Sequence, residues 1–245
     1  MGRIARQYSA SGIYHIVFRG INHQTLFESS EDYQQFLEIV ASLKVEYNFA
    51  LYAFCLMPNH VHLLLKENKR GDISLVMKRL LTKYVRRYNI KYQRSGALIS
   101  GRYKSIPVEI DEYFVSVVRY IHQNPQKAGL VDTLTGYPYS SYAAYLSQEE
   151  TLIDTAFVLD MLPVEQFAAF HQTLEPEHFV VTGKKRRDNE EIRREIIRAY
   201  KVEPKSIAAL PRAERNLLLH QLKEYFSIRE IERATGISRG IIAKS

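Results

Sequence analysis

Two histidines stand two residues apart in an apolar run of the sequence, His60-Val61-His62. The run predicts a β-strand, in which alternate side chains point to the same face, so both imidazoles should project one way while Val61 points into the core. Two parallel imidazoles on a rigid strand form half of a site for a divalent metal ion. Because such a pair is as often structural as metal-binding, a second feature is needed to decide between these uses.

A second feature is found in a segment that predicts a helix beginning at Asp111. Tyr120 and Asn124 lie four residues apart there, which stacks a phenol and a carboxamide on one helix face. Asn124 precedes Pro125, where we expect the helix to stop, so its amide should be able to turn towards a ligand. With two imidazoles, this set suits metal-assisted phosphoryl transfer, in which the phenolate attacks a polarised phosphate. A phenol with a pKa of about 10 needs activation by the metal or by a base.

Two other interpretations of these residues stay open. The chain has 17 tyrosines, and a tyrosine on an amphipathic helix usually packs its ring and exposes its hydroxyl. Tyr113 is the residue most easily confused with a nucleophile, but it lacks an asparagine four residues later. The alternative to a tyrosine nucleophile is a zinc hydrolase, in which His60, His62 and a further histidine hold the metal and an activated water attacks.

The elements around these residues predict an α+β fold with a ferredoxin-like antiparallel sheet. Strands are expected at residues 12–19, 50–56, 60–66 and 102–109, and helices at 30–47, 72–94 and 111–124. The order strand, helix, strand, strand, helix, strand is the split β-α-β pattern of a ferredoxin-like sandwich, with helices on one face. The other face of the sheet is then expected to be open. His15, on the first strand, is a candidate neighbour of the histidine pair.

Composition narrows the class of protein. The single cysteine, Cys55, excludes a disulfide framework and a zinc site built on several thiolates. No apolar run of about 18 residues is present and the first ten residues do not resemble a secretory signal, so we expect a cytoplasmic, nucleoid-associated protein without membrane contact. The sequence also lacks a GxxxxGK[ST] loop, so no nucleotide cofactor is expected.

The net charge of +7 is unevenly distributed. Residues 66–104 hold twelve basic and two acidic side chains, residues 128–183 hold eight acidic and no basic ones, and residues 184–245 hold sixteen basic and nine acidic ones. Two basic blocks separated by an acidic one indicate two surfaces that meet a polyanion. Ordinary solvated helix faces are the alternative.

A series of short motifs runs in order from Gly12 to about Tyr145. They read YHIV at 14–17, RGIN at 19–22, MPNHVH at 57–62, GRYK at 101–104, RYI at 119–121, NP at 124–125, AGL at 128–130 and SSY at 140–142. With these motifs, somewhat over half of the chain resembles the HUH-type tyrosine transposases, and within them the REP-associated group of bacteria.

The resemblance implies a single-stranded DNA endonuclease and strand transferase that acts on palindromic, hairpin-forming repeats. It implies that His60 and His62 ligate Mg²⁺ or Mn²⁺, that Asn124 is the third ligand, and that Tyr120 takes the 5′ phosphate and releases a 3′ hydroxyl. The rival hypothesis is a sequence-specific DNA-binding protein that keeps the fold but does not cut. Because the REP-associated group is generally monomeric, we expect a monomer, although related insertion-sequence transposases are dimers.

Basic side chains predict where DNA phosphates bind. The candidates are Arg79, Lys83, Arg86, Arg87 and Lys91 in the helix at 72–94, Arg102 and Lys104 at the fourth strand, and Arg229 and Arg239 near the C-terminus. Tyrosines interleave with the first group, although those at 84 and 88 fit the apolar stripe of the helix better than a base-stacking surface.

The last part of the chain shows a separate pattern. Residues 227–238 have the helix, glycine turn and helix spacing of a helix-turn-helix, with Ser238 as the cap of the second helix. This region resembles the trihelical DNA-binding domain of bacterial replication initiators, although Glu232 replaces the small residue usual at that position. A helical appendage that packs on the catalytic domain is the alternative. We therefore expect a catalytic domain at 1–146, an acidic helical connector and basic linker at 147–187, and a DNA-binding domain at 188–245.

Overall fold

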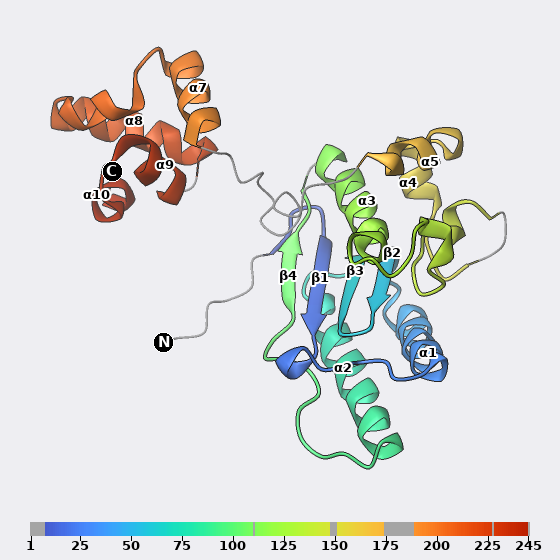
Figure 1. Cartoon of the computed structure of the whole chain (residues 1–245). Helices are drawn as coiled ribbons and strands as arrows, with labels where there is room; N and C mark the ends of the chain where they lie inside the picture. Colours follow the sequence, from blue (N-terminus) through green and yellow to red (C-terminus); the bar gives the residue numbers. More distant parts are fainter. Residues whose placement is uncertain (1–7, 110, 148–150, 174–188, 227, 245) are drawn as a thin grey trace. The chain divides into compact units, whose positions relative to one another are not determined.

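Four strands form one antiparallel sheet in the order β2-β3-β1-β4 (Figure 1). The computed structural model of the chain describes residues 8–109, 111–147, 151–173, 189–226 and 228–244. The strands are β1 Ile13–Arg19, β2 Ala50–Met57, β3 His60–Lys66 and β4 Lys104–Pro107. This strand order, reached through a strand-helix-strand-strand-helix-strand chain, confirms the predicted ferredoxin-like α+β class.

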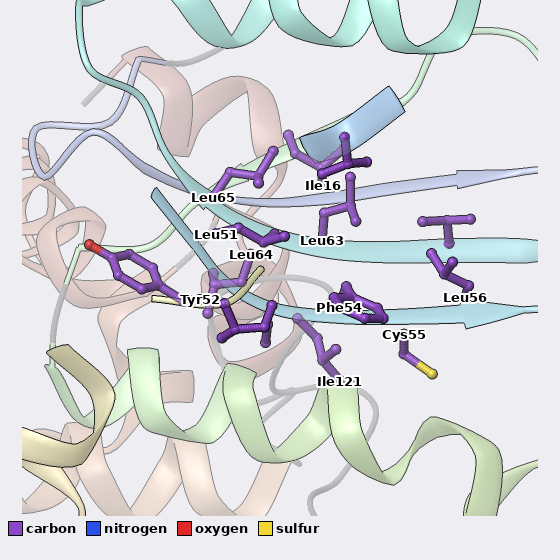
Figure 2. Close-up of a cluster of buried hydrophobic side chains, with 14 of the residues drawn as sticks. Ile16, Leu51, Tyr52, Phe54, Cys55, Leu56, Leu63, Leu64, Leu65 and Ile121 are labelled. Carbon is purple, nitrogen blue, oxygen red and sulfur yellow. The ribbon is translucent and has the colours of Figure 1, made fainter. Parts of the chain in front are cut away.

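Helices cover both faces of the sheet. The helices α1 Ser30–Tyr47 and α2 Asp72–Lys91 pack against each other below one face, and α3 Asp111–Lys127 packs on β2 and β3 from the other. Figure 2 shows Ile16, Leu63 and Leu65 on the α2 side of the strands and Ile121 of α3 on the opposite side. The prediction of an open second face is therefore wrong for β2 and β3, because α3 buries its own apolar stripe there.

The register of the sheet decides which side chains share a face. A tight turn at Pro58 and Asn59 joins β2 to β3, so Met57 pairs with His60 and Cys55 pairs with His62. On the other side of β3, Arg19 pairs with His60, Val17 with His62 and His15 with Leu64. Lys104 of β4 pairs with Val17 and Ile106 with His15. Since side chains opposite each other in a sheet point the same way, these residues all face α3.

The free edge of β2 is covered by the segment that follows α3. The backbone N–H of Leu56 donates to Tyr139 O (2.9 Å), and the N–H of Ser141 donates to Phe54 O (3.0 Å). Further along the strand, the backbone N–H of Asp154 donates to Leu51 O, and the N–H of Leu51 donates to the Asp154 carboxylate. This edge of the sheet is therefore paired along most of its length by non-strand residues.

Two compact units divide the chain, at residues 1–183 and 184–245. The helices α4 Ala156–Met161 and α5 Val164–Gln172 pack on α3 within the first unit. Short 3-10 helices lie at Ile21–His23, Leu134–Gly136, Ala143–Tyr145 and Pro204–Ala209. The described part of the predicted connector is thus a structural part of the first unit.

The second unit has a small core of its own. It contains α7 Asn189–Tyr200, α8 Arg212–Tyr225, α9 Ile228–Thr235 and α10 Arg239–Lys244. Its core includes Ile192, Ile196, Ile207, Leu219 and Leu222. Gly236, between α9 and α10, has φ of 75°, a conformation that favours glycine and fits the predicted turn. No helix among the described residues is both long and apolar enough to cross a membrane.

Candidate active site

A cleft of about 390 Å³ lies beside α3, on the same face of the sheet. Its walls are formed by Val17, Arg19, His23, Met57, Asn59, His60, His62, Lys104, Ile106, Tyr120, Asn124, Lys127 and Ala128. All four residues that the sequence nominates for metal-assisted chemistry are therefore brought together: His60, His62, Tyr120 and Asn124. They come from only two elements, β3 and α3.

The two imidazoles of β3 each have one nitrogen occupied by a neighbour. Nδ1 of His60 lies 2.7 Å from Oδ1 of Asn59, an oxygen that can only accept, so His60 donates from Nδ1. Nδ1 of His62 lies 2.9 Å from Nε2 of His15. In both rings this contact engages Nδ1, so Nε2 is the nitrogen through which a metal ion would be bound.

His15 lies fully buried behind His62. The two rings stack with centroids 5.1 Å apart and an interplanar angle of 18°. The pairing of β1 with β3 places them side by side, as the sequence suggested for a strand residue next to the histidine pair. His15 therefore fixes the orientation of the His62 ring without lining the cleft itself.

Tyr120 points from α3 into the cleft, with 6% of its surface exposed. Its ring is nearly perpendicular to that of His62, with centroids 5.6 Å apart and an interplanar angle of 81°. Tyr113, one heptad earlier on α3, is buried and does not line the cleft. The structure thus separates the two tyrosines that the sequence leaves open to confusion.

The side chain of Asn124 is held by a hydrogen bond to the helix backbone next to Pro125. The prediction that α3 stops at Pro125 is wrong, because the helix continues to Lys127 and ends before Gly129, whose φ is 67°. Proline has no N–H to donate to the carbonyl of Ile121. The side-chain Nδ2 of Asn124 lies 3.5 Å from that oxygen and 2.7 Å from Tyr120 O. A side-chain hydrogen bond also joins Asn124 to His60.

Burial disfavours the protonated forms of His60 and His62. Burial lowers the pKa of His60. The hydrogen bond to Asn124 raises this pKa again, while the nearby Arg19 and His23 lower it further. Burial also lowers the pKa of His62 well below its ordinary value, and His15 and His60 lower it further. A neutral imidazole is the form that ligates a metal. Two Nε2 atoms and an amide oxygen are a donor set that fits a divalent ion with open positions for substrate oxygens.

The zinc interpretation finds no support in the described parts of the chain. There, no group of three His, Cys, Asp or Glu side chains comes together as a metal site. His15 is the histidine nearest to His62, but it contacts the Nδ1 side of that ring. The polar third donor beside the pair is the amide of Asn124.

Three basic side chains of the cleft were not predicted as site residues: Arg19, His23 and Lys127. Arg19 could have been found from the register of β1, since it pairs with His60. Lys127 lies beyond the proline at which the sequence predicts the end of the helix. Of the predicted phosphate-binding residues, Lys104 lines this cleft, and Arg102 is exposed in the loop before β4.

The basic side chains of α2 lie on the opposite side of the sheet from the cleft. Arg79 pairs with Glu46 and donates to the hydroxyl of Tyr47 (2.8 Å). Lys91 pairs with Asp32 and Glu31, each at 2.7 Å. The remaining candidates on α2 are exposed: Lys83, Arg86 and Arg87, the last with an ion pair to Glu38 at 3.9 Å. They form a second basic surface, separate from the cleft.

The C-terminal candidates are only partly described. The side chain of Arg229 lies outside the described residues. Nε of Arg239 lies 2.6 Å from Oε2 of Glu232, across the turn between α9 and α10. Glu232, which departs from the expected small residue, thus joins the two helices through an ion pair.

A buried polar chain behind α3 was also missed. His171 donates from Nδ1 to Phe167 O (2.8 Å) and its Nε2 lies 2.9 Å from Nδ1 of His122. Nε2 of His122 lies 2.8 Å from the Ser141 hydroxyl. Because His171 donates from Nδ1, its Nε2 must accept from Nδ1 of His122. Nε2 of His122 then accepts from the Ser141 hydroxyl. The order resembles a hydrolase triad, but all three side chains are buried, so they have a structural role.

The fold and the cleft define a class: an α+β sandwich in which a histidine-bearing strand faces a tyrosine-bearing helix. Residues 8–124 match the family model described as "Transposase IS200 like". Over 153 residues it is 25% identical to a REP-associated tyrosine transposase of Haemophilus influenzae, covering 58% of this chain and 86% of that protein. These matches confirm the family predicted from the motifs.

A solved structure shows the same fold. The structure of a REP-associated tyrosine transposase bound to a REP hairpin aligns with 64% of this chain and 96% of that chain, with a TM-score of 0.52 and 17% sequence identity. At this identity the likeness concerns the fold and not individual residues. The described second unit, from residue 189 on, lies beyond the region that the family model covers.

Proposed function

We propose that the chain is a metal-dependent tyrosine transposase that cuts and rejoins single-stranded DNA at hairpin-forming palindromes. The observation that supports it best is the convergence of Tyr120, Asn124 and the His60–His62 pair in one cleft. The hairpin substrate is proposed by analogy with the similar structure, which was determined with a REP hairpin. The match of residues 8–124 to the IS200-like family model agrees with this reaction class.

The proposed reaction is a transesterification. Oη of Tyr120 forms a bond to the scissile phosphorus, the bond from phosphorus to the 3′ oxygen breaks, and the phenolic proton is balanced by one gained at the released 3′ hydroxyl. The product is a 5′-phosphotyrosine, and the reverse attack by a 3′ hydroxyl rejoins a strand. Mg²⁺ or Mn²⁺, held by His60, His62 and Asn124, would polarise the phosphate and neutralise developing charge. The burial of Tyr120 beside His62 holds the phenol in position.

A denaturing-gel assay tests this function. Purified protein is mixed with a labelled pool of single-stranded hairpin oligonucleotides, with Mg²⁺ or Mn²⁺ and with chelator. We expect a covalent protein–DNA adduct that needs the metal and is lost in Tyr120→Phe, while hairpin binding persists. Tyr113→Phe is the matched control on the same helix and should keep the adduct. An adduct in Tyr120→Phe would contradict the assignment of the nucleophile.

The second candidate function is DNA binding without cleavage. Tight binding with no adduct across the whole pool would favour it over the enzyme. The second unit is proposed as a separate double-stranded DNA-binding module, because α9, the Gly236 turn and α10 follow one another as in a helix-turn-helix. We propose that the chain acts as a monomer.

A further inference from the structure

The continuation of α3 beyond Pro125 adds a cation to the face that bears the proposed nucleophile. Tyr120, Asn124 and Lys127 are spaced at i, i+4 and i+7, which is one stripe of a helix. All three line the same cleft. A helix that stopped at the proline would not have placed Lys127 in this stripe.

The ammonium group of Lys127 lies close to the phenol. Nζ is 4.8 Å from the centroid of the Tyr120 ring and over its face. Two further cations, Arg19 and Lys104, line the cleft from β1 and β4. Among the described residues that line the cleft, none is acidic. The cleft is therefore suited to an anion, and Lys127 lies over the ring of Tyr120.

Attack on a phosphodiester places negative charge on the non-bridging oxygens of the phosphate. Preorganised cations at those oxygens are among the largest contributions to catalysis of such reactions. A phosphate that reaches the Tyr120 hydroxyl also comes near Nζ of Lys127, whose flexible stem allows it to follow the oxygen. Asn124, in the same stripe, and the histidines of β3 line the same cleft, so they would act on the same phosphate.

We propose that Lys127 is a catalytic residue that binds a non-bridging oxygen of the scissile phosphate. This inference rests on the proposed function, because it assumes that Tyr120 attacks that phosphate. It requires a positive charge at position 127 and a negative charge at one particular DNA linkage.

The test pairs a protein variant with a DNA variant. In a Tyr120→Phe background, which cannot form the adduct, the affinity of the tightest-binding hairpin is measured with a single neutral methylphosphonate moved through every linkage. We expect one linkage whose neutralisation weakens binding with Lys127 but has no effect with Lys127→Gln. Lys127→Arg should retain the sensitivity, and Lys69→Gln, an exposed lysine outside the cleft, should not alter it.

Cleavage supplies the second readout. With Tyr120 restored, Lys127→Gln should lower the single-turnover rate of adduct formation on the order of 10²-fold, and Lys127→Arg should recover most of it. The sensitive linkage should be the one that is cut. A Lys127→Gln protein that still distinguishes the methylphosphonate, or cuts at the native rate, would overturn the inference. Coupling at one linkage without any adduct would instead disprove the enzyme and keep Lys127 as a phosphate ligand.

Discussion

The imidazoles of His60 and His62 are held by neighbouring side chains outside the His-Val-His sequence itself. His62 contacts buried His15 through Nδ1, and His60 donates to Asn59. Such partners orient a metal ligand and fix its tautomer, and their loss typically lowers metal affinity about 10- to 100-fold. The metal site proposed here therefore extends one layer deeper than the three ligands.

His15 provides a prediction at this scale. His15→Leu should weaken Mn²⁺ binding about 10- to 100-fold, because the His62 ring loses its partner. His15→Gln, whose side-chain oxygen can accept from Nδ1 of His62, should recover part of the affinity. Isothermal titration with Mn²⁺ measures both variants, and thermal unfolding shows whether they remain folded. Unchanged affinity in the leucine variant would remove His15 from the metal site.

The sequence was sufficient to find the four central residues and not the side chains around them. His60, His62, Tyr120 and Asn124 were identified by their spacing in short motifs, which local structure preserves. His15 was expected as a neighbour of the histidine pair, but Arg19 depends on the register between two strands 40 residues apart, which no local pattern reveals. Lys127 was missed for a different reason: α3 continues through Pro125 to Lys127, although a proline usually ends or kinks a helix.

At the scale of elements, α5 fixes the position of the helix that bears Tyr120. Arg119 donates to Phe170 O (3.1 Å) and stacks over the Phe170 ring, while Gln123 donates to His171 O (2.7 Å). His122 joins the same two helices through His171. The sequence predicted this region as a connector because its acidic, irregular composition hides the buried Phe167 and His171.

This contact predicts a pH dependence of stability. Burial lowers the pKa of His171 to about 4 and that of His122 well below its ordinary 6.5. As pH falls below 6.5, the unfolded chain binds protons that the folded chain excludes, so the free energy of unfolding decreases by up to about 1.4 kcal/mol per pH unit for each histidine. The contribution of His171 is fully present above pH 6.5 and stops declining near pH 4.

Denaturant titrations between pH 7.5 and 4 measure this effect. In His171→Gln the free energy of unfolding should be lower at pH 7.5, because the contact to His122 is lost, and should fall less steeply towards pH 4. His220→Gln, at an exposed position of α8, is the control and should keep the native slope. Parallel curves for the native chain and His171→Gln would contradict the assignment.

At the scale of the whole molecule, the chain consists of two units with separate cores. Among the described residues, no side chain belongs to both cores. The sequence predicted two domains separated by an acidic connector and linker at 147–187. The structure moves the described acidic helices into the first unit, because their apolar residues pack on α3.

We therefore predict that residues 1–183 fold and react without the second unit. This fragment should show a cooperative calorimetric transition and form the metal-dependent adduct, because the described residues that line its cleft come from β1, β2, β3, β4, α3 and the adjoining turns. Residues 184–245 should retain any affinity for double-stranded DNA. A fragment 1–183 that is unfolded would show that the two cores depend on each other.

The covered edge of β2 limits how copies of this chain can associate. A sheet grows into a neighbouring molecule through strands whose backbone groups are unpaired. On β2 those groups are already bound by Tyr139, Ser141 and Asp154. On the opposite margin, β4 has only four residues and ends at a proline, which makes it a poor template for a further strand. Continuous sheets between copies are thus disfavoured on both sides, which agrees with the proposed monomer.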